Sequence, residues 1–328
     1  MRARVIRNHG EPDIFEWLER ATPEPATGQV RIAVKAASVN PVDLKVRSGE
    51  APLNPPMPAT LGCDVAGVIE AVGPGGDRFQ VGDRVYGCVG GVGAHQGTYA
   101  THVLADSRLL ARMPEGMDFR HAAALPLVTI TAAEGIDDKA DIKPGESILV
   151  FGGTGGVGHV ALQWAAARGA VVHTTASSDE KASLARGFGA AAVHNHREIA
   201  AEDWAALAPG GKGYDVVYDT VGGDHLPIAF HAARLGGRVI STVSLGAIDL
   251  TQVHLKSLSL GVVFMLIPLL HGEGLERHGQ ILQEAAQMVE TRRLRPLLDA
   301  SRFTLEQVAE AHAHLASGKA VGKVVLDV

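Results

Sequence analysis

A glycine-rich segment in the middle of the chain constrains the fold more than any other feature. It lies between an apolar run, Ser147–Phe151, and a stretch rich in Ala, Leu and Gln, and it consists of Gly153, Thr154, Gly155, Gly156, Val157 and Gly158. The spacing G-x-G-x-x-G between a strand and a helix is typical of a loop that binds the pyrophosphate of a dinucleotide. In that interpretation Gly153 permits the tight turn, Gly155 lets the backbone approach the phosphates, and Gly158 lets helix and strand pack closely. An ordinary glycine turn is the alternative.

Apolar runs alternate with helix-favouring stretches between about residues 126 and 295. The runs predict strands at Ile148–Phe151, Val171–Thr175, Ala192–Asn195, Val216–Asp219, Val239–Val243 and within Leu258–Met265. Helices are expected between them, at Val157–Arg168, Glu180–Phe188, Glu198–Leu207 and Pro227–Leu235. Such alternation is typical of a parallel sheet covered on both faces. We therefore predict an α/β protein in which residues 126–295 form a Rossmann domain with a doubly wound, six-stranded parallel sheet.

The segments outside this domain differ in character. Residues 1–125 contain short apolar runs separated by Gly, Pro and Asp, which is typical of a β-rich domain. Two candidate helices, Arg277–Thr291 and Phe303–Leu315, precede an apolar strand at Gly322–Val328. Because this strand follows the dinucleotide-binding domain, we expect the chain to return to its first domain. The prediction is a discontinuous β-rich catalytic domain formed by residues 1–125 and 296–328.

Composition and charge limit the partners and the cellular location that we expect for this chain. The 328 residues carry a formal net charge of −6, which argues against a nucleic-acid partner. The longest apolar run, Leu258–Leu270, is shorter than the roughly 20 residues that a membrane-spanning helix needs. No secretory signal is evident at the N-terminus, and two cysteines provide no disulfide framework. We expect a cytoplasmic enzyme without a membrane partner.

The end of the second predicted strand indicates which dinucleotide binds. NAD-binding domains carry Asp or Glu there to bind the ribose hydroxyls. The segment His173–Ser178 contains no acidic residue. Ser177, Ser178 and Lys181 could instead bind the 2′-phosphate of NADPH, because Lys181 is cationic and no carboxylate repels the phosphate. The same residues could begin a helix with a serine N-cap, and both interpretations can hold together.

Three further motifs carry a resemblance to a known family. They are Val39–Lys45, Leu61–Val68 and Gly322–Leu326. Together with the glycine loop, they resemble the medium-chain dehydrogenase/reductase superfamily, and most closely its zinc-free quinone oxidoreductase branch, over essentially the whole chain. The resemblance implies a GroES-like catalytic domain and hydride transfer from NADPH to a quinone or an α,β-unsaturated carbonyl. It also implies a homodimer, in which the strand within Leu258–Met265 pairs with its copy and covers a bare sheet edge.

The resemblance and the fold together suggest further cofactor contacts. These candidates are Thr131, His196, Val243, Ser244, Phe264, Met265 and Lys323. Thr131 is also a catalytic candidate and would act at the nicotinamide or its ribose, and His196 stands where relatives carry an aromatic residue near the adenosine phosphates. Val243 and Ser244 follow a predicted strand, where ligands gather in this fold. A buried threonine bonded to a carbonyl is the alternative for Thr131, and a core position is the alternative for Phe264 and Met265.

The positions that bind zinc in the alcohol dehydrogenases of this superfamily carry other residues here. Those that replace the three catalytic ligands are Asn40, Cys63 and Leu127. Where four cysteines hold a structural zinc in those relatives, this chain has only Cys88. Two close histidine pairs, at positions 194/196 and 312/314, lack a third ligand at useful spacing. Because a catalytic zinc needs three protein ligands and a structural zinc needs four, we expect no metal site.

Without a metal, an acceptor that delocalises negative charge is favoured over an isolated carbonyl. Asn40 could donate a hydrogen bond to a developing enolate, and Lys45 could add positive charge near it. Asn40 also precedes Pro41 and stands three residues before Asp43, a pattern typical of a helix start. Capping therefore remains an alternative for Asn40 and is the favoured interpretation for Asp43.

Two other functions fit the same motifs. An enoyl-thioester reductase would use the same cofactor with a different acceptor. A non-catalytic NADPH-binding sensor or structural protein would keep the glycine loop, but would not need Asn40 and Thr131.

Overall fold

The computed structural model describes residues 1–75, 78–223 and 225–328, which form two compact units. The first unit contains Met1–Leu127 and Leu266–Val328, and the second contains Val128–Met265. The prediction placed the second boundary at residue 296, whereas the returning segment starts at Leu266.

A six-stranded parallel sheet forms the centre of the second unit. Its strands are β9 (Ser147–Phe151), β10 (Val171–Ala176), β11 (Ala192–Asn195), β12 (Tyr214–Asp219), β13 (Ala233–Ser241) and β14 (Ser259–Val262). The spatial order is β11-β10-β9-β12-β13-β14, so the direction of winding reverses between β9 and β12. This is the doubly wound Rossmann sheet that the alternation of strands and helices predicts.

Helical segments connect these strands. They are α3 (Pro126–Ala133), the π-helix η3 (Glu134–Lys139), α4 (Gly156–Ala167), α5 (Asp179–Gly187), the 3₁₀ segment η4 (Ala201–Leu207), α6 (His225–Ala232) and α7 (Thr251–Leu255). Every residue of β9 is buried, as expected for the central strand of a covered parallel sheet. On one face, Phe151 packs with Trp204 and Phe230 in a cluster of buried side chains. The prediction of an α-helix at Glu198–Leu207 is corrected to a shorter 3₁₀ segment.

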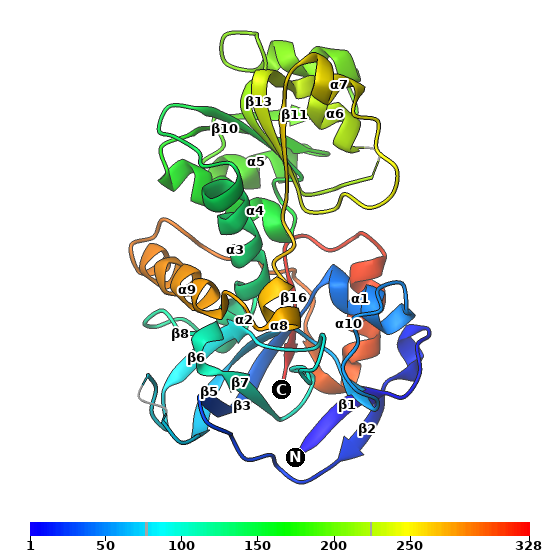
Figure 1. The fold of residues 1–328 in the computed structure, drawn as a ribbon, viewed down its shortest axis with the longest axis vertical. Coiled ribbons are helices and arrows are strands. Elements are labelled where there is room, and N and C mark those ends of the chain that lie inside the picture. Colours follow the sequence, from blue (N-terminus) through cyan, green and yellow to red (C-terminus); the bar gives the residue numbers. More distant parts are fainter. Residues whose placement is uncertain (76–77, 224) are drawn as a thin grey trace. The chain divides into compact units, whose positions relative to one another are not determined.

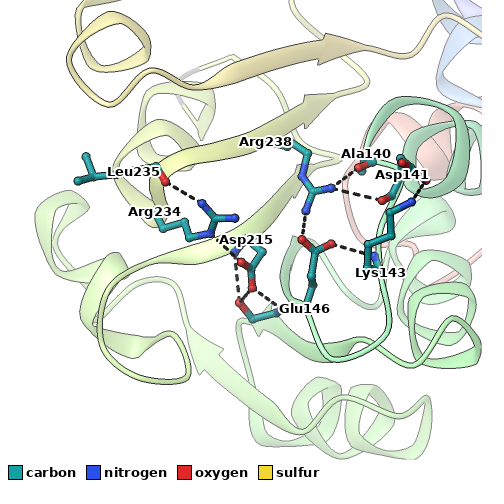
Figure 2. Close-up of polar contacts among 9 residues, drawn as sticks. Ala140, Asp141, Lys143, Glu146, Asp215, Arg234, Leu235 and Arg238 are labelled. Carbon is teal, nitrogen blue, oxygen red and sulfur yellow. Dashed lines mark hydrogen bonds and ion pairs between the residues drawn. The ribbon is translucent and has the colours of Figure 1, made fainter.

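Polar contacts fix the amino ends of three strands (Figure 2). Asp215 of β12 accepts hydrogen bonds from the backbone nitrogen and hydroxyl of Ser147, both at 2.8 Å, and from Nε of Arg234 at 2.7 Å. Arg238 of β13 pairs with Glu146 and donates to the carbonyl oxygen of Ala140 at 2.6 Å. These bonds set the register of β9, β12 and β13 at the edge opposite their carboxyl ends.

The first unit is mainly antiparallel. One sheet has the order β15-β16-β3-β5-β6-β8, with β7 also paired to β3, and another has the order β2-β1-β4. The strands are β1 (Arg2–Ile6), β2 (Glu16–Glu19), β3 (Gln29–Val39), β4 (Ala59–Thr60), β5 (Asp64–Val72), β6 (Arg84–Cys88), β7 (His102–Asp106), β8 (Leu110–Arg112), β15 (Phe303–Thr304) and β16 (Val324–Asp327). Its helical segments are η1 (Pro12–Ile14), α1 (Pro41–Ser48), η2 (Ser107–Leu109), α2 (Phe119–Ala123), α8 (Ile267–His271), α9 (Leu275–Glu290), η5 (Leu305–Gln307) and α10 (Val308–Ala316).

The C-terminal segment joins this unit in two ways. The last strand, β16, pairs antiparallel with β3, with Val324 opposite Val39. Helix α9 packs on β6 and β8, where Tyr86 donates a hydrogen bond to the Leu282 carbonyl oxygen at 2.5 Å. In Figure 1 the orange α9 and the red β16 accordingly belong with the blue and cyan strands. The amphipathic face of α9 thus explains why the returning segment starts before residue 296.

Among the residues that the structure describes, no helix combines the length and the apolar character needed to cross a membrane.

Candidate active site

The glycine loop follows β9 and leads into α4. A Cβ atom at Gly158 would lie 2.0 Å from the carbonyl oxygen of Gly152, so close packing requires glycine there, as predicted. At Gly153 a Cβ would lie 2.2 Å from Oγ1 of Thr174, whereas the positive φ of the turn, 78°, belongs to Gly152. The turn role predicted for Gly153 therefore falls to Gly152, and Gly153 makes room for β10.

The N-terminus of α4 has the form of an anion site. Gly155 occupies the N-cap position and has no side chain to bond the first N–H groups of the helix. A Cβ at Gly155 would meet only the carbonyl oxygen of Gly152, at 3.2 Å, so the backbone there can be approached closely. Thr154 is buried, and Gly156 and Val157 are half-buried in the same loop. These free donors suit a pyrophosphate.

The residues after β10 surround the position where NAD-binding domains carry an acid. The strand ends at Ala176, and Ser178 caps α5, with its hydroxyl accepting a hydrogen bond from the Lys181 backbone at 3.3 Å. Ser177 and the Lys181 side chain are half-buried. The helix-cap interpretation of Ser178 is thus confirmed, and Lys181 lies one turn into the helix.

His196 lies beside these residues. Its ring is hydrogen-bonded to the Ala176 backbone, and burial, followed by the charges of His225 and Arg197, lowers its pKa. The Nδ1 atom is buried and has no hydrogen-bond partner among the described residues. A buried nitrogen of this kind is suited to a ligand group.

Two other loops follow the carboxyl ends of strands in this sheet. After β12, Asp219 is fully buried and accepts hydrogen bonds from the backbone nitrogens of Val221 and Gly222 at 3.0 Å. After β13, Val243 packs against Gly222, and Ser244 follows it, half-buried. Asp219 thus fixes the loop after β12, and Gly222 of that loop lies against Val243.

The remaining candidates of the second unit differ in exposure. Past the end of β14, Phe264 is 47% exposed, whereas Met265 is 5% exposed. Thr131 lies in α3 and is buried, and its carbonyl oxygen accepts a hydrogen bond from Tyr218 at 2.7 Å. The exposure of Phe264 does not fit the alternative that it is a core residue. The burial of Met265 does fit that alternative.

In the first unit, Asn40 and Asp43 form a capping box at the start of α1. Oδ2 of Asp43 accepts a hydrogen bond from the Asn40 backbone nitrogen at 2.8 Å, so the capping interpretation of Asp43 is confirmed. Lys45 lies one turn further along α1 and is half-buried. Pro41 occupies the first helical position, which its fixed φ favours.

The side chain of Asn40 is held at both ends. Its amide nitrogen donates to Oδ2 of Asp64 at 2.9 Å, and its amide oxygen accepts from the ammonium of Lys323. Asp64 also accepts from the Ser38 hydroxyl at 2.7 Å and from the Leu127 backbone nitrogen at 2.8 Å. The Lys323 ammonium lies 3.6 Å from Asp64, and Lys323 is only 3% exposed. This lysine, predicted as a cofactor contact, therefore has buried protein acceptors.

A second set of polar groups extends from Asp43. Tyr99 donates to its carboxylate at 3.3 Å, Cys63 donates to it at 3.4 Å, and His312 contacts the Tyr99 hydroxyl at 3.1 Å. Burial raises the pKa of Asp43 to about 6, and nearby Asp64 adds to the shift. Burial lowers the pKa of His312 to about 3. At neutral pH His312 is thus uncharged, and Asp43 titrates close to neutrality.

The structure also shows which groups stand at the positions that bind zinc in the alcohol dehydrogenases of this superfamily. At the three positions of the catalytic zinc ligands this chain offers the Asn40 amide, the Cys63 thiol and the Leu127 backbone nitrogen. A hydrogen bond with Cys88, together with burial, raises the pKa of the Cys63 thiol. In the parts of the chain that the structure describes, no group of three or more His, Cys, Asp or Glu side chains is placed to hold a metal ion.

Sequence reasoning missed Asp64, Tyr99 and Asp219 as site residues. Asp64 lies within the quoted motif Leu61–Val68, directly after Cys63. An acid between Cys63 and Val65, in an otherwise apolar segment, was the available signal, because such a group is buried only when it is paired.

Comparisons with known proteins agree with this architecture. A family model described as the alcohol dehydrogenase GroES-like domain matches residues 26–115, and one described as zinc-binding dehydrogenase matches residues 188–326. Human quinone oxidoreductase is 34% identical over 328 residues, which covers 99% of this chain and 97% of that protein.

Solved structures show the same relationship. An alcohol dehydrogenase superfamily protein from Novosphingobium aromaticivorans superposes with a TM-score of 0.95 at 40% identity. Escherichia coli quinone oxidoreductase complexed with NADPH superposes with a TM-score of 0.87 at 27% identity. Both comparisons cover 100% of each chain. The chain therefore belongs to the quinone oxidoreductases of the medium-chain dehydrogenase/reductase superfamily.

Proposed function

We propose that this oxidoreductase uses NADPH to reduce a quinone or an α,β-unsaturated carbonyl, and that the reaction needs no metal. The observation that carries the proposal is the Asn40 amide, which Asp64 and Lys323 hold from both sides where zinc-dependent relatives carry a metal ligand. A fixed amide can donate to an oxygen that gains charge, but it cannot replace a Lewis acid.

The residues of the second unit fit a nicotinamide dinucleotide. The loop Gly153–Gly158 supplies backbone donors for the pyrophosphate, and the buried Nδ1 of His196 supplies a further polar contact. No acidic residue ends β10, and Lys181 stands in the first turn of the next helix, so a 2′-phosphate meets a cation there. The Escherichia coli relative complexed with NADPH supports the same choice.

Bound NADPH would supply the hydride. Asn40 is 0% exposed, so substrate binding would have to uncover its amide; the second N–H, the one not directed at Asp64, would then donate to the substrate oxygen as it gains charge. The buried ammonium of Lys323 polarises that amide through its oxygen. Because the conjugated acceptor spreads its charge, one or two such donors suffice, and Lys45 or solvent can supply the proton.

The same residues explain the choice of substrate class. Reduction of an isolated carbonyl places nearly a full negative charge on one oxygen, which this amide alone would stabilise poorly. A quinone or an enone distributes that charge and accepts the hydride on carbon. We therefore propose that simple alcohols and ketones are not substrates.

We also propose that the protein is a homodimer formed through β14. This strand ends the six-stranded sheet, and its N–H groups alternate in direction. Val263 donates to the Ser241 carbonyl oxygen of β13 at 3.0 Å, so the neighbouring Val262 N–H faces the open edge. Val262 is 46% exposed and Leu255 is 66% exposed. An open edge with apolar neighbours favours pairing with a second copy. A cytoplasmic location is part of the same proposal.

A substrate panel tests the reaction. We expect NADPH to be oxidised with a simple quinone or an enone, and not with acetone or with a CoA thioester of a 2-enoic acid. Turnover restricted to the thioester would identify an enoyl-thioester reductase. NADPH binding without turnover of any acceptor would indicate a sensor, and efficient NADP-dependent oxidation of ethanol would contradict the proposed substrate class.

A further inference from the structure

Two histidines and a tyrosine of the second unit form a cluster that the proposed reaction does not use. Nδ1 of His173 on β10 lies 2.9 Å from the hydroxyl oxygen of Tyr214 on β12, and 3.2 Å from Nε2 of His194 on β11. The hydroxyl oxygen lies 3.4 Å from Nε2 of His194, which closes a triangle of three ligand-type atoms.

The sheet itself builds this triangle. Strand β10 lies between β11 and β9, and β12 lies on the other side of β9, so the His173 side chain contacts Tyr214 across one intervening strand. The ring centroid of His173 lies 5.3 Å from those of both His194 and Tyr214. All three donors therefore come from strands of one rigid sheet.

The three residues of the triangle differ in exposure. Tyr214 is fully buried and His173 is 9% exposed, whereas His194 is half-buried. The Trp204 ring lies edge-on to His194, at 6.0 Å between centroids. His194 is therefore the most exposed member of the triangle, and a small cation would enter on its side.

Hydrogen bonding alone does not satisfy all three contacts. A ring nitrogen either carries a proton or accepts one, and the hydroxyl supplies one hydrogen. With one protonated nitrogen, two hydrogens serve three contacts, so one contact has no hydrogen directed along it. A cation placed between the three lone pairs would satisfy all of them.

We propose that His173, His194 and Tyr214 form a binding site for Zn²⁺. Zinc binds imidazole nitrogen at about 2.0–2.1 Å in tetrahedral geometry, which sets neighbouring ligand atoms about 3.3–3.4 Å apart. Separations of 2.9, 3.2 and 3.4 Å need only a slight expansion to match this. The fourth position would hold a water molecule on the side of the half-buried His194.

The chemistry of the three groups agrees with the geometry. Burial lowers the pKa of both imidazoles, so they are neutral, which is the form that binds a metal. Burial raises the pKa of Tyr214, so its proton leaves to solvent only as the cation takes its place on the oxygen. Because Zn²⁺ would join three strands, its binding should also stabilise the folded protein.

Sequence spacing could not reveal this site. His194 follows His173 by 21 positions, and Tyr214 follows His194 by 20. The tyrosine completes the group, which is why the absence of a cluster of three His, Cys, Asp or Glu among the described residues does not conflict with it.

The test uses full-length protein stripped of metal with a chelator. Co²⁺, whose tetrahedral complexes absorb visible light, should bind at one equivalent per chain, and Zn²⁺ should displace it. Zn²⁺ should also raise the melting temperature. The variants His194→Ala and Tyr214→Phe should each weaken Co²⁺ binding by at least about tenfold, whereas His254→Ala, at an exposed position of the same unit, should leave it unchanged.

Tyr214→Phe should still fold, because it keeps the buried ring and removes only the hydroxyl oxygen. Weaker Co²⁺ binding by this variant therefore cannot be attributed to unfolding. Absence of a saturable tetrahedral Co²⁺ spectrum in the wild type would overturn the proposal. Equal affinity in the wild type, His194→Ala and Tyr214→Phe would overturn it as well. Neither result would bear on quinone reduction, which the substrate panel tests separately.

Discussion

The amide oxygen of Asn40 accepts a hydrogen bond from the ammonium of Lys323, although the two lie 283 positions apart in the chain. Both residues are buried, and Asp64 holds the other end of the amide. A lysine is buried in this way only when its charge is compensated, and here the compensation comes from Asp64 at 3.6 Å. The orientation of one candidate catalytic amide thus depends on two distant ends of the chain.

Replacement of this amide should reduce turnover more than it affects substrate binding. We expect Asn40→Ala to lower kcat by about 100-fold, the effect of removing one donor to a developing oxyanion, with a smaller change in KM. Steady-state kinetics with a quinone would measure this. Ser38→Ala is the matched control, because Ser38 donates to the same Asp64 oxygen. A variant Asn40→Ala that loses only about 1 kcal/mol of stability and keeps its kcat would show that the residue serves as a cap.

Cofactor preference should depend on Lys181. The variant Lys181→Ala should weaken NADPH binding by roughly 1–3 kcal/mol, the range for a lost charge-assisted hydrogen bond, and leave NADH binding nearly unchanged. Fluorescence titration with both cofactors would measure the difference. Lys212→Ala, an exposed lysine of the same unit, is the charge-matched control. Equal wild-type affinities for NADPH and NADH would refute the assignment.

The buried Asp43 should make stability depend on pH. Burial raises its pKa from 3.8 to about 6, so the folded protein binds this proton more tightly than the unfolded chain does. Its contribution to stability is therefore full below pH 3.8 and is lost as pH rises through 6. As pH rises from 4 to 8, the free energy of unfolding of Asp43→Asn should increase relative to that of the wild type by up to about 3 kcal/mol. Urea unfolding across this range would show the trend, and a constant difference would contradict it.

Activity should not require a metal. After dialysis against a strong chelator, the enzyme should keep its kcat with a quinone, because Asn40 and Leu127 leave the zinc positions of its relatives without ligands. Elemental analysis of the same samples would show whether any zinc that remains bound is needed for activity. Loss of activity on chelation, with recovery on adding zinc, would contradict the proposed mechanism.

The open edge of β14 should control assembly. Proline at Val262 removes an N–H that faces the edge and leaves the Val263 bond to β13 intact. We expect the wild type to sediment as a dimer and Val262→Pro as a monomer or as aggregate. A wild type that is monomeric at micromolar concentration would show that the edge stays unpaired.

Local patterns predicted the parts of this molecule that are themselves local. The spacing of Gly153, Gly155 and Gly158 after an apolar strand predicted the Rossmann unit, because Gly153 and Gly158 are required by neighbours in the adjacent strand and close in the sequence. The helix start at Asn40 was visible for the same reason. The partners of Asn40 were not visible, since pairing of β3, β5 and β16 brings Asp64 and Lys323 to it. The strand predicted within Leu258–Met265 is β14, but the apolar run does not reveal that its later part forms α8, which belongs to the other unit.

The antiparallel pairing of β16 with β3 has a consequence for biosynthesis. The second unit is continuous in sequence, so it can fold as soon as Met265 has left the ribosome. The first unit must wait, because β3 lacks one neighbour and Asn40 lacks Lys323 until residues 323–327 have been made. A nascent chain stalled before that point would expose an unpaired strand edge beside an uncompensated buried acid, Asp64. The chain thus assembles its dinucleotide fold during translation and acquires the Asn40 network only when translation is almost finished.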